Sequence, residues 1–201
     1  MSQPIFLPGA TTVGIAGKDS VVLASEKRFA YGYFVLSKSA RKVFPVSKKI
    51  GAACAGVVAD MQNLVKEATA IVNLYRIENR TEPSVQTVAK LLSWQLFSSR
   101  FFPYFTETIV GGLDDKGTHV IVLDPLGSII EDDYAVVGTG AEIAVGVIEN
   151  EYKKDMTSEE LYNLAVKAIR SSIARDAGSG NGIDILLYTS EGLKINETLT
   201  V

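Results

Sequence analysis

Two pairs of amphipathic helical segments, separated by runs of β-type sequence, most constrain how this 201-residue chain can fold. In the first pair, apolar residues recur at three- and four-residue spacing through residues 57–78, and a second stripe follows Pro83-Ser84, where Ser84 can cap a helix. In the second pair, Gly138-Thr139-Gly140 opens a helix that extends to about Tyr152, and residues 157–160 form a capping box ahead of another. Each pair is predicted to pack together.

Alternating or β-rich runs lie before, between and after these pairs. The predicted strands are residues 11–16, 20–25, 33–36, 42–46, 50–55, 106–113, 118–123, 128–130, 183–188 and 193–199. The run 50–55 is almost wholly apolar, which predicts a strand buried on both faces. Two antiparallel sheets with the helix pairs outside them bury every apolar face in this order. The sequence therefore predicts an α+β fold, a four-layer α-β-β-α sandwich.

The amino-acid composition excludes several classes of partner and of catalytic site. With 47% hydrophobic residues and no linker-like stretch, the chain is predicted to form one domain. The net charge is −3 and basic residues are scattered, which argues against a nucleic-acid or membrane partner. A single cysteine, Cys54, and a single histidine, His119, exclude an intramolecular disulfide and a His-based metal cluster, and leave little room for a Ser-His triad. No signal-like start or membrane-length apolar run is present, which predicts a cytoplasmic protein.

The stretch from Gly9 to Gly14 has one suggestive feature. Some hydrolases use a threonine that becomes the first residue after a leader is removed, so that its hydroxyl is the nucleophile and its α-amine the base. Such a site needs a Gly-Thr junction, and Gly9 supplies the glycine, but Ala10 stands where the threonine would be. Taken alone, a Thr/Val run after Pro-Gly is typical of an ordinary first strand.

Several motifs in register resemble the β-subunits of proteasomes, those of archaea most of all. They are Thr11-Thr12-Val13-Gly14, residues 24–28, Lys42, residues 55–60, Gly138-Thr139-Gly140 and residues 175–180. The resemblance covers essentially the whole chain from Gly9 to the last hairpin. It implies the N-terminal nucleophile hydrolase fold and a threonine-type endopeptidase that degrades unfolded proteins, with autocatalytic removal of the leader.

The resemblance also implies roles for individual residues. Ala10 falls on the catalytic threonine, Lys42 on the active-site lysine and Glu26 on its acidic partner, with Arg28 nearby. Gly56 falls on the oxyanion donor, and Asp176 and Ser179 fall beside the α-amine, while Thr139 stands where many members have serine. The substrate pocket would be lined by Phe29, Ala40, Cys54 and Val58.

Each of these residues also has a structural interpretation. Lys42 would be a solvated charge on a strand edge, and Glu26 part of an exposed strand end. Gly56 would be a plain strand-to-helix turn, Asp176 a helix-end residue and Ser179 a turn former. Cys54 would be a small core residue, and Trp94 and the run 101–105 are predicted to lie in the core.

Because alanine has no hydroxyl, this chain can neither attack a peptide bond nor cut the Gly9-Ala10 junction by the family's route. We therefore predict an uncleaved leader over residues 1–9, followed by a catalytic-type domain over 10–201. The supporting residues are retained, which favours an engineered inactivation of an otherwise active subunit. The alternatives are a naturally non-catalytic, structural β-subunit, and the related bacterial threonine peptidase, whose chains lack the 175–182 loop pattern.

The partners follow from the resemblance as well. It implies a heptameric ring with other β-subunits, flanking rings of α-subunits, and a regulatory ATPase that acts indirectly through the α-ring. The substrates would be unfolded proteins. No metal or other cofactor is implied.

Overall fold

The computed structural model describes residues 9–32 and 34–201. Residues 1–8 of the predicted leader therefore lie outside the described residues, as does residue 33 of the strand predicted over 33–36. The described part contains two five-stranded sheets and a short two-stranded hairpin, in which all paired strands run antiparallel.

The first sheet has the strand order β10-β1-β2-β11-β12. Its strands are β1 (Thr12–Ala16), β2 (Ser20–Glu26), β10 (Tyr134–Val137), β11 (Ile183–Thr189) and β12 (Gly192–Leu199). The second sheet follows chain order and consists of β5 (Val43–Pro45), β6 (Ile50–Gly56), β7 (Thr106–Asp114), β8 (Gly117–Leu123) and β9 (Ile130–Asp132). The separate hairpin is formed by β3 (Phe29–Tyr31) and β4 (Phe34–Ser37).

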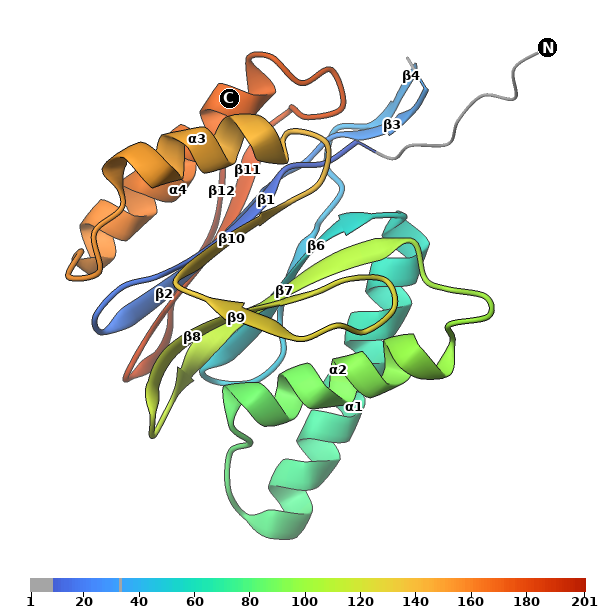
Figure 1. Ribbon diagram of the computed structural model, residues 1–201, viewed down its shortest axis with the longest axis vertical. Coiled ribbons are helices and arrows are strands. Elements are labelled where there is room, and N and C mark those ends of the chain that lie inside the picture. The colour runs from blue at the N-terminus through green and yellow to red at the C-terminus, as the bar shows by residue number, and fades with distance from the viewer. Residues whose placement is uncertain (1–8, 33) are drawn as a thin grey trace.

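The helices cover the outer faces of the two sheets. They are α1 (Val58–Asn79), α2 (Val85–Ser98), α3 (Ala141–Glu151) and α4 (Ser158–Ile173). In Figure 1, α3 and α4 lie against the first sheet, while α1 and α2 lie against the second. Three hydrophobic clusters fill the spaces between the layers, one under each helix pair and one between the sheets. The predicted four-layer sandwich is confirmed.

The central strand β6 shows how the sequence builds these layers. Ile50, Ala52 and Cys54 belong to the cluster under α1 and α2, whereas Ala53 and Ala55 belong to the cluster between the sheets. Because successive side chains of a strand point to opposite faces, an uninterrupted apolar run is needed where both faces are covered. The prediction of a strand buried on both faces is confirmed.

Local signals place two helix starts correctly. Ser84 caps α2 by accepting a hydrogen bond from the backbone N–H of Thr87. Thr157 and Glu160 form the predicted capping box at the start of α4. These caps satisfy N–H groups that have no partner within their own helix.

Three predictions of local structure are wrong or incomplete. The sequence did not indicate β3 or β10, and the strand predicted over 128–130 begins only at Ile130. Both missed strands have three or four residues, too few for a periodic pattern to emerge. Trp94 and the 101–105 aromatics were predicted to lie in the core, but Trp94 is 65% and Phe102 is 92% exposed. Phe101 and Phe105 are exposed as well, on the connection to β7, whereas Tyr104 is half-buried and packs against the cluster under α1 and α2.

Tyr188, on β11, is a buried polar group with a testable consequence. Its side chain is fully buried between the sheets, and burial raises the pKa of its hydroxyl. Among residues 9–32 and 34–201, the hydroxyl has no hydrogen-bond partner. A buried hydroxyl without a partner destabilises a fold, because it has lost its bonds to water.

Tyr188→Phe is therefore expected to raise the free energy of unfolding by about 1 kcal/mol, measured by chemical denaturation. Tyr152→Phe is the matched control, because the Tyr152 hydroxyl donates to the Ala16 carbonyl at 2.9 Å. The control should lower the free energy of unfolding by about 1 kcal/mol. An equal loss in both variants would show that the Tyr188 hydroxyl is in fact bonded.

Candidate functional site

Ala10 lies immediately before β1, at the end of the cluster between the two sheets, and is fully buried. Its backbone N–H donates to the Thr139 hydroxyl at 3.2 Å, and its carbonyl accepts from the Gly140 N–H, also at 3.2 Å. The loop before α3 therefore holds the backbone of residue 10 from both sides.

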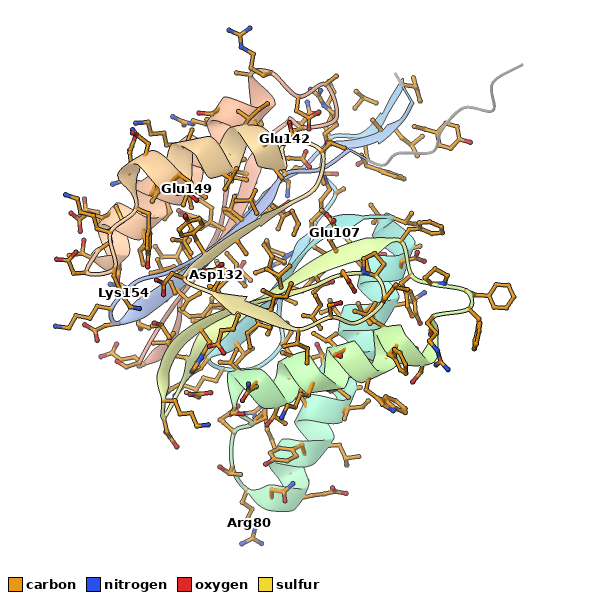
Figure 2. All side chains as sticks on the ribbon, in the orientation of Figure 1. Arg80, Glu107, Asp132, Glu142, Glu149 and Lys154 are labelled. Carbon is orange, nitrogen blue, oxygen red and sulfur yellow. The ribbon has the colours of Figure 1, made fainter. Side chains whose placement is uncertain are left out.

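The close approach of this loop depends on glycine. Gly138 has a φ of +98°, and a Cβ at this position would lie 2.3 Å from the Ala10 carbonyl oxygen. Glu107, labelled in Figure 2 on β7, accepts a hydrogen bond from the Gly138 N–H at 3.0 Å. The second sheet thus anchors a loop that contacts the start of the first sheet.

The segment after α4 adds an acidic group to the same place. Asp176 Oδ2 accepts hydrogen bonds from the hydroxyls of Thr139 and Ser179, both at 2.7 Å. Asp176 Oδ1 accepts from the Gly178 N–H at 3.0 Å. Residue 10 is therefore connected through Thr139 to Asp176, and through Asp176 to Ser179.

A buried ion pair forms the other half of the site. Lys42 is 1% exposed and Glu26 is fully buried, and the Lys42 ammonium donates to Glu26 Oε1 and to the Arg28 carbonyl. Glu26 Oε2 accepts from the backbone N–H groups of Arg28 at 2.6 Å and Gly180 at 3.0 Å. The alternative interpretations, a solvated lysine and an exposed acidic strand end, are both wrong.

Burial dominates the protonation behaviour of this pair. It raises the pKa of the Glu26 carboxyl above 4.5, although Lys42 and the two N–H groups act against the rise. It lowers the pKa of the Lys42 ammonium below 10.5, although Glu26 and, from farther away, Asp176 act against the fall. A lysine whose pKa is lowered gives up its proton more readily and can exchange protons with a neighbouring group.

The loop of residues 175–182 connects the two halves. Ser179 bonds to Asp176, while its neighbour Gly180 bonds to Glu26. Arg28 holds the same loop, because its guanidinium donates to the Ala177 carbonyl at 2.7 Å and to Asn181 Oδ1 at 3.0 Å. The structure therefore brings Ala10, Glu26, Lys42, Thr139, Asp176 and Ser179 into one connected network.

Gly56 ends β6 next to this network. Its φ is +136°, and its neighbour Ala55 shares the inter-sheet cluster with Ala10. Of the four residues predicted to line a substrate pocket, Phe29, Ala40 and Val58 are half-buried, whereas Cys54 is fully buried in β6. Burial raises the pKa of the Cys54 thiol to about 12, and its sulfur lies 3.6 Å from the Thr108 hydroxyl. Cys54 is thus an uncharged core thiol.

A cavity of about 240 Å³ opens on the leader side of residue 10. Its lining includes Gly9, Arg28, Ala30, Val35, Thr139 and Asp176. Sequence reasoning did not indicate this cavity, nor the contacts of Glu107 with Gly138 and of the Arg28 guanidinium with the 175–182 loop. These contacts join residues that are far apart in the sequence, so they can be seen only in the folded structure.

Within residues 9–32 and 34–201, no group of three His, Cys, Asp or Glu side chains is arranged to hold a metal ion. In the same part of the chain, no helix has both the length and the apolar character needed to cross a membrane.

Comparison with known proteins places these features in a family context. The family described as "Proteasome subunit" matches residues 7–187. The chain is 49% identical to proteasome subunit beta 2 of Pyrobaculum arsenaticum, over 94% of this chain and 93% of that protein. It is 48% identical to proteasome subunit beta 2 of Thermofilum pendens, over 92% and 91%. It is 46% identical to proteasome subunit beta 1 of Nitrosopumilus maritimus, over 94% of each chain.

Proposed function

This chain belongs to the proteasome subunit family, as a β-subunit of archaeal type, and from that membership we propose that it carries a threonine endopeptidase site whose nucleophile position is occupied by alanine. In this proposal residue 10 is the nucleophile position, and Gly9-Ala10 is the junction at which an active chain would release its leader. The chain as it stands is an inactive, unprocessed subunit. An active chain, with threonine at residue 10, would degrade unfolded proteins in the cytoplasm, supplied by a regulatory ATPase that acts through the α-ring.

One observation carries the proposal. Although Ala10 has no hydroxyl, its backbone remains bonded to Thr139, which leads to Asp176 and Ser179, and the buried Lys42–Glu26 pair is attached to the same loop through Gly180. A buried ion pair rarely stabilises a fold more than apolar residues would. A purely structural role for this region would therefore not explain why Lys42 and Glu26 are buried here.

The proposed chemistry assigns each group a role. A threonine hydroxyl at residue 10 would attack a carbonyl carbon and pass its proton to a neighbouring base, a step helped by the lowered pKa of Lys42. After the leader is released, the new α-amine would act as base, with Thr139, Asp176 and Ser179 orienting it. The Gly56 N–H is assigned to the developing oxyanion. The cavity beside Gly9 would receive the chain on the leader side.

A second candidate function has one observation in its favour. Ala10 is fully buried in the inter-sheet cluster, so it fills the position as an ordinary core residue. A naturally non-catalytic β-subunit that builds the ring would need no more than this.

Assembly tests the shared part of both candidates. Proteasome subunits form rings, and we expect this chain, coexpressed with an archaeal α-subunit, to enter one large particle of heptameric rings. The β-chain recovered from it should retain residues 1–9 by intact mass, and the particle should cleave no peptides. Each chain expressed alone is the control. A β-chain that stays monomeric beside its α-partner would contradict the proposal. The natural codon at position 10 then separates the two candidates.

A further inference from the structure

Thr11, the residue after the nucleophile position, has a hydroxyl that the proposed mechanism does not use. The side chain is fully buried, and its Oγ1 lies 2.7 Å from the Ser179 hydroxyl. The backbone leaves room for this contact, because a Cβ on Gly140 would lie 2.1 Å from Thr11 Oγ1. The hydroxyl therefore occupies a site that only a glycine-containing loop permits.

The direction of each proton in this network follows from counting donors. Ser179 has one hydroxyl proton, which it gives to Asp176 Oδ2, so it can only accept from Thr11. Thr139 also gives its one proton to Asp176 at 2.7 Å, in preference to the Ala10 carbonyl at 3.3 Å, since bonds to a carboxylate are the stronger. Thr139 is then an acceptor toward the nitrogen of residue 10.

We propose that Thr11 is a positioning residue of this site, whose hydroxyl fixes the Ser179 proton on Asp176 and thereby sets the proton affinity of the α-amine at residue 10. A hydroxyl that accepts a hydrogen bond is the stronger donor, because bonds in a chain polarise one another, so the bond from Ser179 to Asp176 weakens when the Thr11 hydroxyl is removed. The carboxylate would then be less neutralised, and the neighbouring amine would hold its proton more tightly. This inference rests on the proposed threonine endopeptidase function.

The matched control is the next residue along the strand. Thr12 is equally buried, and its hydroxyl bonds to Ser25 at 2.7 Å and donates to the Cys54 carbonyl at 2.9 Å. Thr12→Val removes the same atoms as Thr11→Val, but from a network that does not include Asp176. A difference between the two variants therefore reports on the Ser179 contact rather than on lost burial or lost hydrogen bonds.

The first measurement uses the chain as it stands, with Ala10, and needs no activity. Thr11→Val is expected to speed hydrogen exchange at the Gly178 and Ser179 amides, which donate to Asp176, by about tenfold, the factor that corresponds to one buried hydrogen bond. Thr12→Val should leave these amides unchanged. Equal exchange in both variants would overturn the positioning role. Thr11→Ser keeps the hydroxyl and should behave as the parent chain.

The second measurement uses assembled particles that carry Ala10→Thr. Because the amine must be deprotonated to act as base, a tighter-held proton moves the acid limb of the kcat/KM profile to higher pH in Thr11→Val. Thr11→Ser should return the limb to its original place, and an unmoved limb in Thr11→Val would overturn the inference. If the Ala10→Thr particle is itself inactive, the proposed function fails, and the exchange measurement still decides whether Thr11 positions the loop.

Discussion

Replacing Ala10 with threonine is expected to restore both removal of residues 1–9 and cleavage of short peptides. The new hydroxyl would attack the Gly9 carbonyl, the amide bond would give way to an ester, and water would hydrolyse that ester to leave a free amine on residue 10. Peptides with an apolar residue before the cut should be preferred, because the four predicted pocket residues are uncharged. Loss of the nucleophile of a serine protease lowers kcat by about 10⁶. The peptidase activity of the Ala10→Thr chain should therefore be readily measured, whereas the chain with Ala10 should show none.

Ala10→Val is the matched control for this experiment. Valine has the shape of threonine, with a methyl group in place of the hydroxyl, so it tests whether the fully buried position tolerates the larger side chain. We expect the valine chain to assemble, retain its leader by mass and remain inactive. If the threonine chain assembles fully yet keeps its leader and cleaves no peptide, the supporting residues are not a working site. The ring-building, non-catalytic function should then replace our proposal.

Removing the Lys42 ammonium in the Ala10→Thr background is expected to abolish both leader removal and peptide cleavage, in Lys42→Ala and in the closer match Lys42→Met. The ammonium is the buried positive charge of the site, and its lowered pKa suits it to proton exchange. The same change leaves Glu26 buried without its counter-ion, which costs about 3–5 kcal/mol for a fixed charge. Glu26 can relieve part of this cost by taking up a proton, because its pKa is already raised.

Two controls separate chemistry from stability. The Lys27 ammonium pairs with Asp184 at 2.6 Å on the edge of the same region, with little exposure, and the one bond of Lys27 to the 175–182 loop is made by its backbone N–H, which Lys27→Met retains. Lys27→Met should therefore lower stability and leave peptide cleavage measurable. The double variant Glu26→Gln, Lys42→Met removes both charges and should recover stability without recovering activity. Normal turnover by an assembled Lys42→Met particle would contradict the catalytic assignment.

Much of the fold could be read from the sequence because its signals are local. Ser84 and Thr157 mark helix starts through bonds to residues three positions away, and the apolar run of β6 reports two covered faces directly. The exposure of Phe102 could not be read in this way. Its aromatic character predicts burial, but whether a sheet lies within reach is decided by the path of the whole connection.

The site likewise has one part that the sequence could indicate and another that depends on the tertiary structure. The residue types at positions 26, 42, 176 and 179 could be matched to a family pattern, yet the burial of Lys42 depends on three segments that meet only in the folded chain. The Thr11 contact joins residues 168 positions apart. A threonine before a strand carries no local sign of such a partner, so only the tertiary structure could indicate it.

The loop of residues 175–182 has a consequence for how this site can evolve. Ser179 and Gly180 are adjacent, yet one serves the hydroxyl network and the other the buried ion pair. A backbone shift that accommodates a substitution in one group must displace the other, since a single peptide unit joins them. Substitutions in the two groups should therefore show epistasis, and neither group can drift alone while the loop keeps its present path.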